Sequence, residues 1–194
     1  SDIKKKTEIN YPKEFQENLS LYPYFFFDKN LSFNSVIIID ENAPEKDIRN
    51  ANLMLKNLKK IDESITNESI KIYPKYSDLS KNNAILIGSC SQEPLNKFVN
   101  IYLDCVSMKK EQALIRVIDH HGTWLLYVVG YDPNKTQNAI QVLDNYKNYN
   151  LTGQDVEVVS ENWIKNNHET VSQWLKGVKA KDGTPAEEKV FSKY

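Results

Sequence analysis

The stretch Val36-Ile37-Ile38-Ile39-Asp40-Glu41-Asn42-Ala43-Pro44 carries the clearest structural signal in this 194-residue chain. Its first four residues form a continuous β-branched run, as expected for a strand that is buried on both faces. The next five turn the chain, and Pro44 can occupy the first turn of a helix. Apolar residues then recur at helical spacing, at Ile48, Ala51, Leu55 and Leu58. A buried strand followed by a core-facing helix predicts an α/β protein.

The same alternation continues along the chain. We expect further strands at 70–73, 84–87, 113–118, 124–129 and 156–159, and helices at 94–102 and 132–146. The strands at 113–118 and 124–129 are joined by a short turn, so they form a hairpin. The order predicts an α/β fold with a mostly parallel sheet flanked by helices and one β-hairpin.

The two ends of the chain differ from its middle. Residues 1–32 are rich in aromatic side chains, and we interpret them as an arm that lays its rings against the body. Residues 33–160 form the α/β domain. Residues 161–194 form an appended C-terminal amphipathic helix, with Trp163 and Trp174 on one stripe, and a tail.

Composition excludes several classes of partner. The chain has 25 basic and 26 acidic residues, so it has no broad field to attract nucleic acid or anionic lipid. None of its apolar runs approaches the roughly 18 residues of a membrane-spanning helix. We expect no membrane insertion in this segment, and we expect any signal peptide to lie outside it.

The run Val117-Ile118-Asp119-His120-His121 invites a catalytic interpretation. An apolar strand that ends in Asp-His-His is typical of the DHH phosphoesterases, in which paired metals stabilise the attacking and leaving oxygens. No histidine precedes residue 120 to complete the site, and His168 lies far downstream. The alternative is a type I turn over Asp119–Gly122 with the histidines at its exposed centre. We favour the turn and predict no metal site.

The segment Gly88-Ser89-Cys90-Ser91 offers two further alternatives to a structural role. It could cradle a phosphate at a helix N-terminus, but it lacks the glycine spacing of a P-loop or a Rossmann turn. Cys90 could be an activated nucleophile, with His120 or His121 as a base from the far end of another strand. We favour a structural cysteine and expect no cofactor. Cys90 and Cys105 are the only cysteines, either as two thiols or as a disulfide.

Five Asn-x-Ser/Thr sequons give weak support for a secreted protein. They begin at Asn18, Asn30, Asn67, Asn134 and Asn150, which are candidate glycosylation sites.

From about Tyr22 to Val159 the chain resembles the domain found in archaeal S-layer proteins and related secreted archaeal proteins. The matching landmarks follow one another in order: Tyr22-Pro23, Glu41-Asn42-Ala43-Pro44, Asn83 to Gly88, Cys90 and Cys105, Ala113-Leu114-Ile115, Val129-Gly130-Tyr131-Asp132, Val142 to Tyr149, Leu151-Thr152-Gly153, and Val156 to Val159. The chain departs from the family pattern at Ser89-Cys90, where Gly-Pro is usual, and at Val129, where Ala is usual.

The resemblance implies a non-catalytic structural module of an archaeal cell surface. It also implies protein partners, through self-assembly or neighbouring surface domains, and an extracellular location. We predict that Cys90 and Cys105 form a disulfide, which would accord with such a location. One alternative is a surface binding module that uses the aromatic arm and the last helix. The other is the metal-dependent DHH-type phosphoesterase or a cysteine hydrolase.

Overall fold

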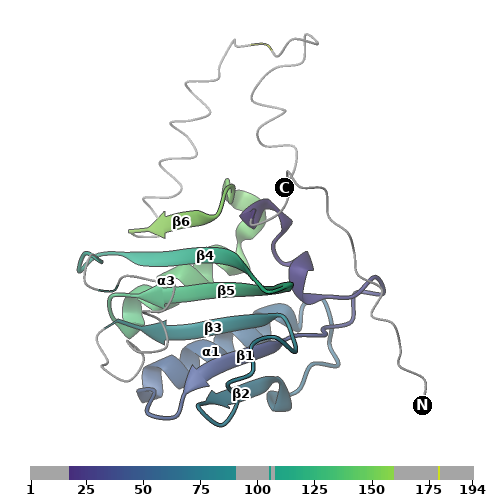
Figure 1. Ribbon diagram of the computed structural model, residues 1–194. Coiled ribbons are helices and arrows are strands. Elements are labelled where there is room, and N and C mark those ends of the chain that lie inside the picture. The colour runs from purple at the N-terminus through teal and green to yellow at the C-terminus, as the bar shows by residue number, and fades with distance from the viewer. Residues whose placement is uncertain (1–17, 91–104, 106–107, 160–178, 180–194) are drawn as a thin grey trace, which may run out of the picture.

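A mixed six-stranded sheet forms the centre of the computed structural model, which describes residues 18–90, 105, 108–159 and 179 (Figure 1). Its order is β2-β1-β3-β5-β4-β6. The strands are β1 (Val36–Asp40), β2 (Ile70–Tyr73), β3 (Ala84–Ser89), β4 (Ala113–His120), β5 (Thr123–Gly130) and β6 (Asp155–Val158). The described α-helices are α1 (Glu45–Leu58) and α3 (Pro133–Asp144). Short 3₁₀ turns occur at Leu19–Leu21, Tyr24–Phe26, Asn67–Ser69 and Tyr146–Asn148.

The strand directions confirm the predicted mostly parallel sheet. Strand β1 pairs in parallel with β2 and β3, and β3 pairs in parallel with β5. Strand β4 is antiparallel to both β5 and β6, so β4 and β5 form the predicted hairpin. Of the six described strands, five therefore run in one direction and β4 runs in the other.

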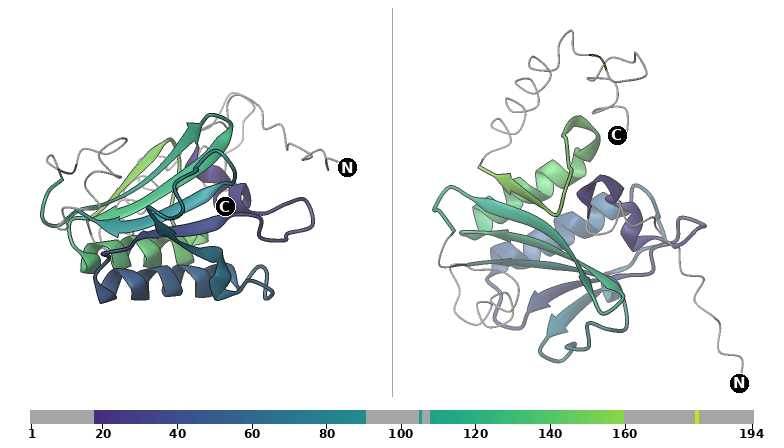
Figure 2. Two further views of the ribbon diagram at one scale, coloured as in Figure 1. Left: turned by 60° about the horizontal axis from the view of Figure 1, so that its bottom comes forward. Right: turned by 45° about the horizontal axis from the view of Figure 1, so that its top comes forward.

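Helices α1 and α3 lie side by side on one face of the sheet (Figure 2). The main core fills the space between these helices and the sheet, and it includes Ile37, Met54, Ile85, Leu126 and Ile140. The helix predicted at 94–102 and the appended C-terminal helix lie outside the described residues. None of the helices in the described part of the chain has both the length and the apolar character that a membrane span requires.

The segment 19–27 contributes five side chains to this core. Leu19, Tyr22, Phe25, Phe26 and Phe27 are all buried in the main core. The ring of Phe25 lies 5.0 Å from the ring of Trp124, centroid to centroid, and the Leu19 amide donates to the carbonyl of Gly153 at 2.8 Å. The aromatic segment thus packs against the α/β body near the start of β5.

The opposite face of the sheet carries a second, smaller apolar cluster. Because side chains alternate across a strand, Ile38, Leu86 and Tyr127 point away from the two helices. The 74–82 segment contributes Leu79 and Tyr76 to this cluster, and the two cysteines lie against it.

The hairpin turn differs from the predicted type I turn over Asp119–Gly122. Asp119 and His120 belong to β4, where they pair with Trp124 and Thr123, so the loop is only His121-Gly122. Both loop residues have positive φ, 51° and 89°, as a type I′ turn requires. This turn suits the twist of a tight hairpin better than type I does, and a glycine at its second position allows it. Asp119 accepts a hydrogen bond from the Gly122 amide at 2.9 Å.

Candidate functional site

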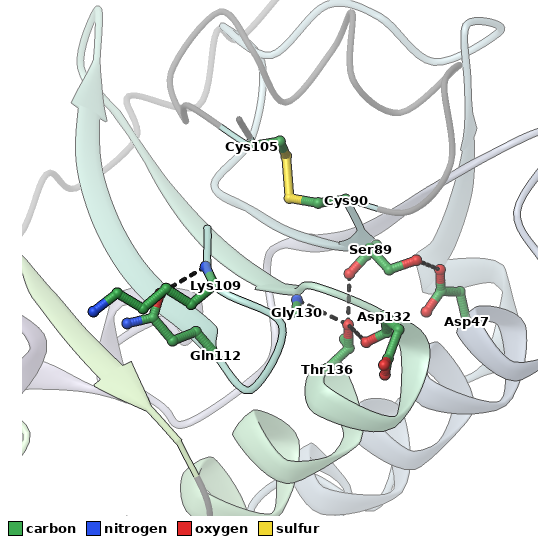
Figure 3. The surroundings of a disulfide bond; sticks show 10 residues. Asp47, Ser89, Cys90, Cys105, Lys109, Gln112, Gly130, Asp132 and Thr136 are labelled. Carbon is green, nitrogen blue, oxygen red and sulfur yellow. Dashed lines mark hydrogen bonds between the residues drawn. A yellow bond between two sulfur atoms is a disulfide. The ribbon is translucent and has the colours of Figure 1, made fainter. Parts of the chain in front are cut away.

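Open α/β sheets bind their ligands at the carboxyl ends of the parallel strands. Candidate site residues are therefore expected at this edge. Strand β3 ends at Ser89 and β5 ends at Gly130, and these two residues are direct partners in the sheet. Helices α1 and α3 begin at the same edge. Figure 3 shows the side chains that meet there.

A disulfide between Cys90 and Cys105 lies at this edge (Figure 3). Their Cα atoms are 5.5 Å apart, within the usual range for a bridge. The Cys90 amide donates to the Gly130 carbonyl at 2.9 Å, so the cysteine is also fixed to β5. The structure therefore contains the predicted disulfide.

A buried carboxylate lies at the same edge, on the side of the sheet that carries the helices. Asp47, in the first turn of α1, is 0% exposed, and its Oδ2 accepts a hydrogen bond from Ser89 Oγ at 2.9 Å. Its Oδ1 accepts from Asn50 Nδ2 at 3.3 Å, and the same nitrogen donates to the Pro133 carbonyl at 2.9 Å. These hydrogen bonds connect α1 to the end of β3 and to the start of α3.

Thr136 connects the same elements from the other side. Its hydroxyl donates to the Gly88 carbonyl at 2.7 Å and accepts from the Gly130 amide at 2.9 Å. Asp132 caps α3 by accepting from the amides of Asn134 and Lys135, and Pro133 begins the helix, as the sequence predicted. The first turn of α3 is thereby held directly against the ends of β3 and β5.

The polar side chains described at this edge bond to one another. Ser89 and Asp47 form a hydroxyl–carboxylate pair, but both residues are 0% exposed, so a substrate cannot reach either of them in this conformation. Gly88 and Ser89 belong to β3 rather than to a loop, and the Gly88 carbonyl is occupied by Thr136. The phosphate-loop alternative needs free backbone amides here, and Cys90 uses its amide on Gly130.

The histidines lie at the other end of the sheet. His120 and His121 form the hairpin before β5, whereas Cys90 follows the strand whose last residue pairs with the final residue of β5. Strand β5 has eight residues, so the two ends are separated by about 23 Å at 3.3 Å per residue. Among the described residues, the structure therefore does not bring Cys90 together with His120 or His121. Within the residues described, no three His, Cys, Asp or Glu side chains gather as metal ligands, and His168 lies outside them.

The five sequon asparagines have different surroundings. Asn30, Asn67 and Asn134 are exposed, whereas Asn18 and Asn150 are half-buried. Asn18 Oδ1 accepts hydrogen bonds from the amides of Ser20 and Gly153. Its position is therefore fixed through the carbonyl oxygen, while a glycan would be attached at the nitrogen.

Burial raises the pKa of Asp47, and the nearby carboxylate of Asp132 adds to this, while hydrogen bonds from Ser89 and Asn50 oppose it. No ion pair to Asp47 is found among the described residues. The fold therefore favours the protonated form of Asp47. The stabilisation that this preference gives is fully present below the unfolded-state pKa of about 3.9, and it is lost as the pH rises through the folded-state pKa.

We expect Asp47→Asn to raise the melting temperature at neutral pH by a few degrees, because it removes a buried charge and retains the shape and polarity of the side chain. The gain should shrink as the pH falls through the raised folded-state pKa of Asp47, because the buried carboxyl group is then itself uncharged. Calorimetry over this pH range measures both effects. The matched control is Asn134→Asp, at an exposed position on α3. If the gain in melting temperature of Asp47→Asn did not depend on pH, the buried charge of Asp47 would not be its cause.

Sequence reasoning missed Asp47, Ser89 and Thr136 as a connected group. A signal for Asp47 was present, because it lies four residues before Ala51 and seven before Met54, on the buried stripe of α1. No protein-family model matches this chain, and no curated protein matches it.

Proposed function

We propose that the chain is a non-catalytic structural module of an archaeal cell-surface protein of the S-layer type. The observation that carries the proposal is the cross-linked carboxyl edge of the sheet, in the part of the chain that the structure describes. Where an α/β enzyme would hold its ligand, this protein has a disulfide and a buried hydrogen-bonded group that joins α1, β3, β5 and α3. This edge is built to hold the fold together.

The disulfide supports the extracellular part of the proposal, because such bonds persist in oxidising compartments and are rare in the cytosol. The exposed sequons at Asn30, Asn67 and Asn134 agree with it, since glycans need surface positions. The partners would be neighbouring surface domains or further copies of the chain.

The proposal predicts where the protein is found in the cells that produce it. It should be recovered in the envelope fraction and should be labelled on intact cells by an amine-reactive reagent that cannot enter them. A cytosolic enzyme of the same cells is the control for leakage. Recovery in the soluble cytosolic fraction, with Cys90 and Cys105 as free thiols, would refute the proposal.

A surface binding module is the second candidate, and one observation favours it. A cleft of about 390 Å³ lies between the ends of α1 and α3 beside Tyr22 and Pro23. Lys60 and Asp144 form an ion pair at this cleft, and burial raises the pKa of Tyr146 to about 12. The aromatic arm itself contributes little free surface in its described part, because Tyr22, Phe25, Phe26 and Phe27 are buried and only the ring of Tyr24 is exposed, at 47%.

A further inference from the structure

The two edge strands of the described sheet, β2 and β6, run in the same direction. Strand β2 is parallel to β1, β3 and β5. Strand β6 is antiparallel to β4, which is itself antiparallel to β5, so β6 is parallel to β5 as well. Edge strands present unpaired backbone groups that can pair with another chain. The edges of two copies can therefore meet as parallel neighbours when both copies have the same orientation.

The side chains on the two edges also match face by face. Ile70 and Ile72 of β2 align with Ile37 and Ile39, which face the helices. Val156 of β6 aligns with Ile115, which faces the helices too. A β6–β2 contact between copies would thus put apolar side chains beside apolar ones, with both helix layers on one side.

On the opposite face, the contact would join opposite charges. Lys71 of β2 and Glu157 of β6 align with Ile38 and Leu114, which both belong to the cluster away from the helices. Lys71 has no salt bridge with a described residue, and Glu157 accepts a hydrogen bond only from the neutral Gln112 within that part of the chain. Asp155 is already paired with Arg116, so Glu157 is the acidic group available for Lys71.

An exposed apolar side chain on β2 also supports a contact at this edge. Ile72 is 39% exposed, one of four large apolar residues in the described chain that are exposed to this degree. Proteins usually protect an edge strand with charge or by keeping it short. Strand β2 is short, with four residues, but it offers Ile72 to solvent at its open edge.

We propose that β6 of one copy pairs in parallel with β2 of the next copy, continuing the sheet from head to tail. This inference rests on the proposed structural function and names its partner as a second copy of the chain. The contact is heterologous and does not close on itself, so it generates an open row of copies, rotated by the twist of the sheet. Each contact involves only four residues from each strand, so it is weak in dilute solution and becomes effective where copies are concentrated on a surface.

Cross-linking of the full chain tests the pairing directly. Lys71→Cys protein mixed with Glu157→Cys protein should form a 71–157 disulfide under mild oxidation, because neighbouring strands lie only about 4.8 Å apart. The yield should exceed by roughly tenfold that of Lys56→Cys protein mixed with Glu157→Cys protein. Lys56 is the matched control, because it is an exposed lysine on α1. Peptide mapping identifies the bond and checks that Cys90–Cys105 stays intact.

Three further variants make the outcome decisive. The double variant with Cys at both 71 and 157 should give a ladder of oligomers rather than a dimer. Lys71→Glu should abolish the concentration-dependent rise in mass in sedimentation of the otherwise native chain, and mixing it with Glu157→Lys should restore that rise. A yield equal to the Lys56 control, or a dominant 71–71 or 157–157 bond, would overturn the proposal. A surface location without the 71–157 bond would refute this contact and leave the structural function standing.

Discussion

Gly130→Ala is expected to destabilise the protein by about 3 kcal/mol or more. A Cβ atom at this position would lie 2.3 Å from the Thr136 amide nitrogen, 2.6 Å from the Lys135 carbonyl carbon and 2.7 Å from the Asp132 carbonyl oxygen. All three are backbone atoms, so no side chain can rotate away to make space. The first turn of α3 must move off the sheet, and the Gly130–Thr136 and Thr136–Gly88 hydrogen bonds are lost with it.

Chemical denaturation of Gly130→Ala beside two control variants measures this effect. Gly122→Ala tests a glycine whose Cβ would meet nothing within 4 Å but whose φ is positive, so it should cost only about 1 kcal/mol. Thr136→Val removes the hydroxyl contacts and keeps the volume, which should cost about 1–3 kcal/mol. If Gly130→Ala unfolds no more easily than Gly122→Ala, the close approach of α3 is not what this glycine provides.

The local sequence predicted much of this architecture because the responsible forces are local. The β-branched run at 36–39 and the apolar run at 84–87 are recognisable wherever they occur, and Asp132-Pro133 fixes a helix start by its own chemistry. The strand boundaries were less predictable. Gly88 and Ser89 continue β3 because β5 supplies partners at Val129 and Gly130, and nothing near residue 88 announces that pairing.

The candidate site was harder to predict because it depends on long-range packing. Ser89 donates to a carboxylate 42 residues earlier in the chain, and Thr136 donates to a carbonyl 48 residues earlier. The prediction of the hairpin turn was wrong for a different reason. The spacing of Asp119 and Gly122 fits a four-residue type I turn, but the pairing of His120 with Thr123 leaves a two-residue loop that must be type I′.

Removing the disulfide, as Cys90→Ala with Cys105→Ala, should lower the free energy of unfolding by about 3 kcal/mol. The two cysteines are 15 residues apart, and in the chain-entropy model a loop of this length gives a stabilisation of that size. The loss should exceed that of an ordinary surface substitution several-fold. Removing the disulfide should also weaken the hydrogen bonds at the carboxyl edge. Cys90 directly follows Ser89, which donates to Asp47, and the Cys90 amide donates to the Gly130 carbonyl.

Adding a reductant separates the effect of breaking the disulfide on stability from the effect of replacing the two cysteine side chains. Adding it to the native chain should lower the melting temperature toward that of the double variant, and it should leave the double variant unchanged. Thiol titration of the unfolded, unreduced protein should find no free thiol, and it should find two after reduction. Two thiols without reductant, with no effect of reductant on melting, would show that the bond does not form in solution. The edge would then rest on Asp47 and Thr136 alone, and the extracellular assignment would lose its strongest chemical support, because a chain with two stable thiols is equally suited to a reducing compartment.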